Sequence, residues 1–351
     1  MSSSSNFIVN SADSGIGCFY RLLHWGPCIA LTVIGIVSSC SIICDLQWWP
    51  PTTLWGGVHL IVFCFWVTAT LYNFFNAAFL GPGHVPRNWA PKSKRDEDKL
   101  QQCIVCKGFK APRSHHCRKC GKCVMKMDHH CPWINNCVGH FNHANFTYFL
   151  AFAPAGCLHG LCILIPSMYR AVTKNYFIRY GSEYDPIVTL SVTMFIFSML
   201  AVGLAVGVII AVGGLCIIQI RSIIKNETSI ESWINDKAHW RRRDTDEEWI
   251  YPYDLGWREN LRQVFSSFYK SDGYRWTVKE GCNQYTLTVE QLQQKAEKRE
   301  RAITYVATEK YNGSWFPISK GICVACCPPC VDEPRIPLLN GDKVSVTRWR
   351  K

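Results

Sequence analysis

Four long stretches of this sequence lack Asp, Glu, Lys and Arg altogether, at residues 22–44, 54–80, 144–169 and 187–220. An apolar stretch of about 20 residues is long enough to cross a bilayer as a helix. The missing charge argues against a soluble enzyme, in which such apolar helices would need a very large covering domain. The first 20 residues also lack the charged start and cleavage site of a signal peptide. We therefore expect an α-helical polytopic membrane protein with four transmembrane helices.

Basic residues are few on one side of these stretches, where Arg170, Lys174 and Arg179 lie in a loop between the third and fourth, and plentiful on the other. The segment 45–53 has no Lys or Arg, whereas residues 81–143 hold twelve against four Asp or Glu, and 22 more follow from Arg221 onward. Basic loops remain in the cytoplasm, so we expect these two regions and both termini to be cytoplasmic. Beside membrane spans, this charge favours contact with anionic lipid or substrate phosphates, and we expect no nucleic-acid partner.

These boundaries divide the chain into six regions. They are a cytoplasmic N-terminal tail at 1–21, transmembrane helices 1 and 2 at 22–80, a cytoplasmic cysteine-rich domain at 81–143, transmembrane helices 3 and 4 at 144–220, a cytoplasmic C-terminal region at 221–335, and the start of an incomplete SH3-like barrel at 336–351. The cytoplasmic assignment predicts that the sequons at Asn226 and Asn312 stay unglycosylated.

The cysteine-rich region contains a repeated spacing within residues 103–137, which hold seven of the chain's twenty cysteines. Three thiolates and one imidazole are usual ligands of a closed tetrahedral zinc site. Two such sets follow C-x2-C-x9-H-x6-C: they are Cys103, Cys106, His116 and Cys123, and then Cys117, Cys120, His130 and Cys137. We therefore expect two structural Zn²⁺ ions, held by an irregular ribbon of short strands. Disulfides are the alternative, but they are rare in a reducing cytosol.

The same repeat leaves Cys131 without a metal. His-His-Cys occurs at 115–117 and again at 129–131, but the second copy has Ile134 where a further cysteine would be needed. The metal expected at the neighbouring His130 favours a thiolate at Cys131. His129 is then a candidate general base, and Asp128 can orient it. Alternatively, Asp128 supports a metal-bound histidine and Cys131 is an unreactive thiol.

The complete motif is C-x2-C-x9-HC-x2-C-x2-C-x4-DHHC-x5-C, with Pro132 and Trp133 directly after its DHHC segment. It closely resembles the motif of the DHHC protein S-acyltransferases, which are membrane palmitoyltransferases. The resemblance implies that Cys131 is the acylated nucleophile, with His129 its base and Asp128 the orienting acid. It also implies two zinc sites, acyl-CoA as the co-substrate, and membrane-associated protein substrates with cytoplasmic cysteines.

Two residues are candidates for contact with the acyl chain at the membrane interface. The third apolar stretch begins only seven residues after Cys137, which places the cysteine-rich domain against the bilayer. Trp133 is expected near the entry of the acyl chain, as the resemblance also suggests. Gly156 and the alanines around it leave room for a tunnel between helices, although close helix packing explains them equally well.

Four residues beyond the last apolar stretch match supporting motifs of the family. Thr228, Ser229 and Glu231 resemble its Thr-Thr-x-Glu motif, and the hydroxyl of Ser229 can hydrogen-bond towards the catalytic segment. From the residues alone, a helix-capping box is the preferred interpretation. Asn260 matches the asparagine of a C-terminal element that packs against the membrane domain, so its expected role is structural.

The C-terminal region offers further hypotheses. Residues 323–330 read CVACCPPC, and this cluster is either a third metal site or a site of acylation. The long region after the last span is most similar to that of the endoplasmic reticulum member of the animal family, which implies the same membrane here.

The predicted function is transfer of a palmitoyl group from acyl-CoA to protein cysteines through an acyl-Cys131 intermediate. The alternative function is not enzymatic: the protein would be a non-catalytic zinc-binding scaffold that docks partners at the membrane. A cysteine protease would leave the four spans unexplained and lacks a peptide-binding signature.

Overall fold

The structure is a computed structural model that describes residues 20–48, 51–182, 185–266, 271–314 and 336–347. The cysteine cluster at 323–330 and nearly all of the expected tail at 1–21 lie outside these residues. The chain divides into two compact units, residues 1–289 and 290–351.

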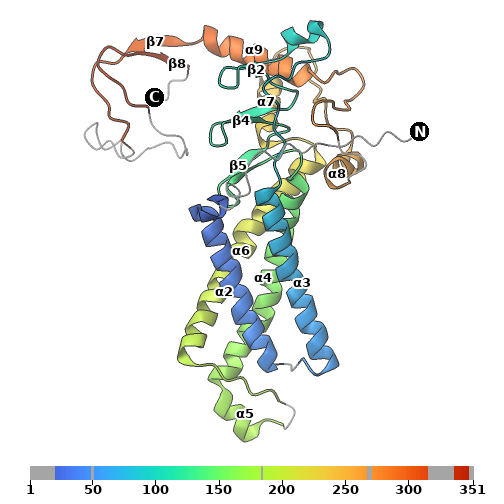
Figure 1. Cartoon of the computed structure of the whole chain (residues 1–351), viewed down its shortest axis with the longest axis vertical. Coiled ribbons are helices and arrows are strands. Elements are labelled where there is room, and N and C mark those ends of the chain that lie inside the picture. The colour runs from blue at the N-terminus through green and yellow to red at the C-terminus, as the bar shows by residue number, and fades with distance from the viewer. Residues whose placement is uncertain (1–19, 49–50, 183–184, 267–270, 315–335, 348–351) are drawn as a thin grey trace. The chain divides into compact units, whose positions relative to one another are not determined.

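Four long helices form a bundle in the first unit (Figure 1): α2 (Trp25–Trp48), α3 (Leu54–Phe79), α4 (His143–Val172) and α6 (Val192–Ile224). Each is long and apolar enough to cross a membrane. Helix α4 contacts the other three, and α2 also packs against α6. Many large apolar side chains on the outside of the bundle are exposed, as expected for surfaces that face lipid. The predicted fold class is therefore confirmed.

Helix ends differ from the sequence-based boundaries for identifiable reasons. The sequence predicts the fourth helix from residue 187, but α6 begins at Val192 because the Ser191 hydroxyl caps it by accepting from the Met194 N–H at 3.2 Å. The sequence also predicts that the first helix ends at Asp45. Helix α2 instead continues to Trp48, and the buried Asp45 carboxylate lies 2.6 Å from Nδ1 of His59 on α3.

Three small antiparallel hairpins make up the ribbon between α3 and α4. Strand β1 (Gln102–Cys103) pairs with β2 (Gly108–Phe109), β3 (His115–Cys117) with β4 (Lys122–Val124), and β5 (His129–Cys131) with β6 (Asn136–Val138). The 3-10 turn η2 (Lys94–Lys99) precedes them, and η1 (Tyr20–Leu23) precedes α2. Strands this short cannot build a hydrophobic core, so the hairpins depend on other cross-links.

Two asparagine side chains hold the last hairpin against the end of α3. The Asn136 amide donates to the carbonyls of Ala77, Ala78 and Leu80 at 3.1–3.3 Å. The Asn142 amide donates to the Ala77 carbonyl at 3.0 Å. Because the last carbonyls of a helix have no partner within it, these bonds satisfy them and fix β5 and β6 close to the bundle.

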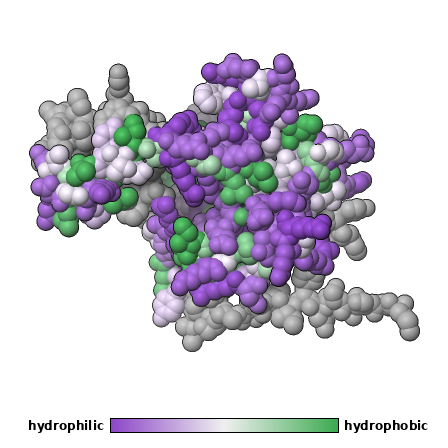
Figure 2. All heavy atoms as spheres, turned by 90° about the horizontal axis from the view of Figure 1, so that it is seen from above, coloured by the Kyte–Doolittle hydropathy of each residue, from purple (hydrophilic) through white to green (hydrophobic). Residues whose placement is uncertain are grey.

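Two further helices follow the last span. Helix α7 (Ser229–Arg242) begins almost directly after α6, and α8 (Trp257–Phe265) packs against α6 and α4. The buried Asn260 of α8 donates to the Ile224 carbonyl at the end of α6 and to Asp254, both at 2.7 Å. These contacts agree with the structural role that the sequence suggests for Asn260. Seen from the end that carries the hairpins, most visible side chains are hydrophilic (Figure 2).

The second unit contains one described hairpin. Helix α9 (Thr286–Glu300) leads into it, and β7 (Ile303–Val306) pairs antiparallel with β8 (Lys343–Val346). The interpretation of residues 336–351 as the start of an SH3-like barrel stays a prediction. In the first unit, a short helix, α5 (Lys174–Tyr180), lies between α4 and α6.

Candidate active site

The eight predicted metal ligands gather into two separate clusters, and the ligand atoms of each lie within 4.8 Å of one another. In the first cluster, the sulfurs of Cys103 and Cys106 lie 3.4 and 3.3 Å from Nδ1 of His116. In the second, the sulfurs of Cys120 and Cys137 lie 3.5 Å apart, and each is within 3.6 Å of Nδ1 of His130.

These distances fit a tetrahedral metal site. With Zn–S of about 2.3 Å and Zn–N of about 2.0–2.1 Å, tetrahedral angles place sulfurs about 3.8 Å apart and a sulfur about 3.5 Å from a nitrogen. The two clusters interleave along the chain, because β3 carries His116 for one and Cys117 for the other. Each cluster can therefore hold one metal ion and link two hairpins.

Strand β5 separates metal binding from the candidate chemistry. Successive side chains of a strand point to opposite faces, so His129 and Cys131 share one face and His130 occupies the other. His130 belongs to the second metal cluster, whereas Cys131 belongs to neither. The Cys131 thiol is buried and close enough to the His129 imidazole to influence its pKa.

Asp128 and His129 form a close pair, with Oδ2 of Asp128 2.8 Å from Nδ1 of His129. Burial alone would lower the pKa of His129, but its hydrogen bond with Asp128 and its interaction with Cys131 outweigh burial and raise the pKa to about 10. Burial would raise the pKa of Asp128, yet the neighbouring His129 and the Ser229 backbone hold it well below its usual range. A proton taken from Cys131 is thus retained on His129 near neutral pH.

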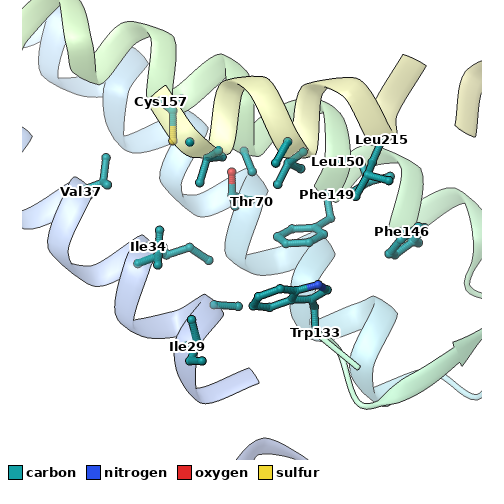
Figure 3. A pocket seen from close by; sticks show the side chains of 18 of the residues that line it. Ile29, Ile34, Val37, Thr70, Trp133, Phe146, Phe149, Leu150, Cys157 and Leu215 are labelled. Carbon is teal, nitrogen blue, oxygen red and sulfur yellow. The ribbon is translucent and has the colours of Figure 1, made fainter. Parts of the chain in front are cut away.

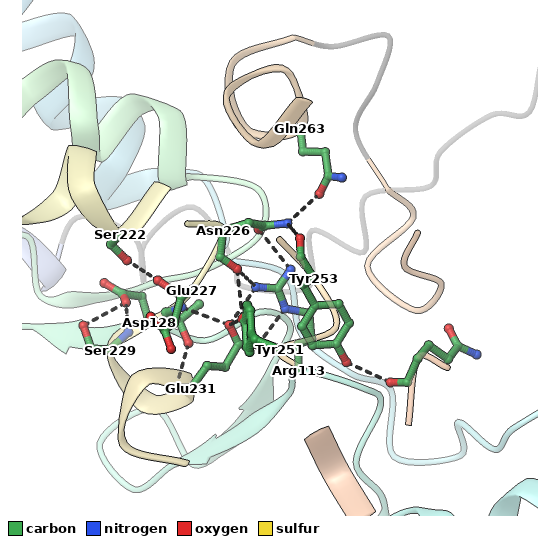
Figure 4. Close-up of polar contacts among 12 residues, drawn as sticks. Arg113, Asp128, Ser222, Asn226, Glu227, Ser229, Glu231, Tyr251, Tyr253 and Gln263 are labelled. Carbon is green, nitrogen blue, oxygen red and sulfur yellow. Dashed lines mark hydrogen bonds and ion pairs between the residues drawn. The ribbon is translucent and has the colours of Figure 1, made fainter. Parts of the chain in front are cut away.

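The carboxylate of Asp128 is also held by a residue that is distant in the sequence (Figure 4). Ser229, the first residue of α7, donates to Oδ1 of Asp128 from its backbone N–H at 2.7 Å and from its hydroxyl at 2.9 Å. The positive N-terminus of α7 further favours the anion. Thr228 and Glu231 form the predicted capping box behind Ser229, so the two interpretations of this motif are compatible.

A cavity of about 700 Å³ lies inside the helix bundle and reaches the Asp128–His129–Cys131 segment. Figure 3 shows Trp133, Phe146 and Leu215 at one end, with Val37 and Cys157 at the other. Its lining is almost entirely apolar and comes mainly from α2, α3, α4 and α6, with residues of the 128–133 segment and Ser229 at one end. Cavities of about 300–1,000 Å³ with a few polar groups at one end are typical ligand sites.

The predicted site residues fall into two groups. Asp128, His129, Cys131, Trp133, Gly156 and Ser229 all line this cavity, whereas Thr228, Glu231 and Asn260 do not. A Cβ at Gly156 would come within 3.2 Å of the Trp66 Cβ, so the glycine both borders the cavity and allows α4 to approach α3.

Sequence reasoning missed Gly26. This residue lies in the first turn of α2, where an added Cβ would come within 2.0 Å of the Pro132 carbonyl oxygen. The preceding residue, Trp25, packs edge-on against Trp133 with ring centroids 5.4 Å apart. Only a glycine lets α2 approach the segment after Cys131 so closely. A lone glycine in an apolar stretch gives no signal of this contact.

Sequence reasoning also missed Arg113, whose buried guanidinium donates to both carboxylate oxygens of Glu231 at 2.6 Å (Figure 4). It also donates to the Asn226 carbonyl at 2.6 Å and lies 4.2 Å from the centroid of the Tyr253 ring. This cluster ties the β2–β3 connection to α7. Arg113 is one of many basic residues in its segment, so the sequence alone does not show that this arginine, and not a neighbour, forms a buried ion pair.

The fold and site define a multi-pass membrane enzyme in which two Cys₃His clusters lie beside Cys131, the candidate nucleophile. Residues 96–236 match the family model described as DHHC palmitoyltransferase. The chain is 48% identical to Palmitoyltransferase ZDHHC6 of Mus musculus over 345 residues, 93% of this chain and 83% of that protein. The Danio rerio protein of the same name is 48% identical over 347 residues, 94% and 84% of the two chains. Probable protein S-acyltransferase 16 of Arabidopsis thaliana is 32% identical over 247 residues, 67% of this chain and 82% of the relative.

The chain belongs to the DHHC palmitoyltransferase family. This confirms the resemblance inferred from the motif, and with it the predicted activity, protein S-palmitoylation.

Proposed function

We propose that Cys131 carries the acyl group between fatty acyl-CoA and a protein cysteine. The observation that supports this most directly is the position of Cys131: it lies outside both metal clusters, beside His129, and lines an apolar cavity inside the bundle. A fatty acyl chain can occupy the cavity while its thioester lies at the Cys131 end. Trp133 borders that end, where the chain enters.

The reaction proceeds in two steps. His129 takes the Cys131 proton while Asp128 holds the imidazole orientation, and the thiolate attacks the thioester carbonyl carbon. The bond to the CoA sulfur then breaks, and CoA leaves as a thiol after protonation. In the second step, a substrate cysteine attacks acyl-Cys131 and regenerates the free thiol. This order predicts ping-pong kinetics.

The two metal clusters are proposed to bind structural Zn²⁺. Their Cys₃His composition and ligand distances support zinc, and all four ligands of each set come from the protein. Bound zinc would cross-link hairpins that have no core of their own. Cys103, Cys106, His116 and Cys123 would hold one ion, and Cys117, Cys120, His130 and Cys137 the other.

The proposed location is the endoplasmic reticulum membrane, with both termini and the hairpins in the cytoplasm. Protein substrates would be membrane-associated and present their cysteines on that side. The sequon at Asn226 is then expected to stay unglycosylated; its side chain is buried and its amide donates to the Tyr253 carbonyl at 2.8 Å. A glycan at Asn226 would contradict this orientation.

A Cys131→Ser variant tests the proposed role. The protein, purified in detergent and incubated with labelled palmitoyl-CoA, should acquire a hydroxylamine-sensitive label that the variant lacks. Elemental analysis should find the same zinc content in both proteins, which shows that the variant is folded. Equal labelling would reject Cys131 as the acyl carrier, and absence of label in the parent would favour a scaffold role.

A further inference from the structure

One polar side chain interrupts the apolar α6 wall of the cavity. Every other α6 residue that lines the cavity is apolar or a glycine, but Gln219 in the penultimate turn is an amide. Gln219 lies one turn beyond Leu215 on the same face, and Figure 3 places Leu215 at the end of the cavity that holds Trp133 and Phe146. Phe146 packs against His129 with ring centroids 5.4 Å apart. The Gln219 amide is therefore at the reacting end.

A buried histidine fixes the orientation of this amide. Nε2 of Gln219 lies 2.6 Å from Nε2 of His143, at the start of α4. His143 in turn lies within electrostatic range of Asp128. Among the residues that the structure describes, Gln219 makes no other side-chain hydrogen bond. Both residues are buried, so the pair holds the amide in place.

Gln219 keeps a hydrogen-bond donor that His143 does not use. If the amide nitrogen donates to His143, its second N–H remains; if the amide is turned so that its oxygen accepts from His143, both N–H groups remain. Ser229 also lines this end of the cavity, but its hydroxyl and its backbone N–H both donate to Asp128.

Attack on a thioester creates a need for such a donor. When the Cys131 sulfur bonds to the carbonyl carbon, the C=O π electrons move to the oxygen, which becomes an oxyanion. Collapse restores the carbonyl, breaks the bond to the CoA sulfur and releases CoA. A donor held in place beforehand stabilises the oxyanion and typically changes kcat by about 10²–10³-fold.

We infer that Gln219, oriented by His143, donates a hydrogen bond to the thioester oxygen as Cys131 attacks. This assignment rests on the proposed role of Cys131 and adds a catalytic residue from the last span. It predicts that Gln219 acts on acyl transfer and not on the intrinsic reactivity of the Cys131 thiol.

Two reactions of the same thiol separate these effects. Gln219→Leu and Gln219→Met should slow single-turnover acylation by palmitoyl-CoA about 100-fold with little change in the palmitoyl-CoA concentration that gives half the maximal rate, because neither supplies the N–H. Alkylation of Cys131 by iodoacetamide forms no oxyanion, so its rate should stay unchanged. Thr68→Val, which removes a hydroxyl from an exposed position of α3 that does not line the cavity, should acylate at the parent rate, and zinc content should match in all variants.

The outcomes are distinct. Acylation of both Gln219 variants at the parent rate would overturn the inference, and so would a parallel fall in alkylation, which would mark Gln219 as a support for Cys131. If the parent itself takes up no label, the proposed function fails and this inference fails with it.

Discussion

Ser229 binds Asp128 across 101 positions of sequence, donating to a single carboxylate oxygen from its backbone N–H at 2.7 Å and its hydroxyl at 2.9 Å. The bond joins the first residue of α7 to the residue before β5. The placement of Asp128, and through it of His129, therefore depends on a helix that follows the last membrane span.

Removing the hydroxyl tests this dependence. Ser229→Ala should lower the single-turnover acylation rate about tenfold, since a hydrogen bond to a charged group contributes about 1.5–3 kcal/mol and the backbone N–H remains. Ser229→Thr, which keeps a hydroxyl, should stay near the parent rate. Equal rates in the alanine variant and the parent would show that the hydroxyl does not support Asp128.

Two glycines of α2 provide a matched pair. A Cβ at Gly26 would lie 2.0 Å from the Pro132 carbonyl oxygen, whereas a Cβ at Gly35 would have nothing within 4 Å. Gly26→Ala should displace the segment after Cys131 and lower the acylation rate on the order of 100-fold, because small misplacements at a reacting centre are costly. Gly35→Ala should acylate normally. Similar rates for both variants would contradict the close approach.

The Arg113–Glu231 pair predicts a pH-dependent difference in stability. Burial would raise the pKa of Glu231, but the Arg113 guanidinium outweighs it and the pKa is lowered. A carboxylate with a lowered folded pKa contributes stability above its unfolded pKa of about 4.3 and loses it as pH falls further. Glu231→Gln should therefore lower the free energy of unfolding at pH 7 by an amount on the order of 3 kcal/mol, and the difference from the parent should shrink below about pH 4.

Thermal unfolding in detergent at a series of pH values measures this difference. Comparing the two proteins at each pH cancels changes that both undergo in acid, including loss of metal. Glu259→Gln is the control, because Glu259 forms an exposed ion pair with Arg262 at 3.5 Å and should change stability by less than about 1 kcal/mol. A difference that persists unchanged in acid would exclude the ionised pair as its cause.

The number of bound metal ions tests the two proposed zinc sites. Elemental analysis of the purified protein should find two zinc ions per chain, because two complete Cys₃His clusters are present among the described residues. Cys120→Ser should bind fewer ions, and Cys131→Ser should keep both. Strong chelation should abolish acylation, since the hairpins depend on the metal. A third ion in the parent would point to the cysteines at 323–330.

The spacing of residues in the sequence predicts much of the fold and of the candidate site. Four charge-free stretches predict four spans, because a bilayer excludes charge whatever the neighbouring helices do. The repeated C-x2-C-x9-H-x6-C pattern predicts two metal sites and isolates Cys131, because ligand type and spacing are local properties. Strand alternation in β5 adds that His130 and Cys131 face opposite ways.

The tertiary structure alone decides which distant groups meet this segment. Arg113 contacts Glu231 across 118 positions, Gln219 contacts His143 across 76, and Gly26 contacts Pro132. Each is a buried polar pair or a close backbone approach, which depends on how the helices pack. The pattern of residues within one segment does not indicate which distant residue that segment will contact. The cavity and the groups at its reacting end are therefore decided only when the chain folds.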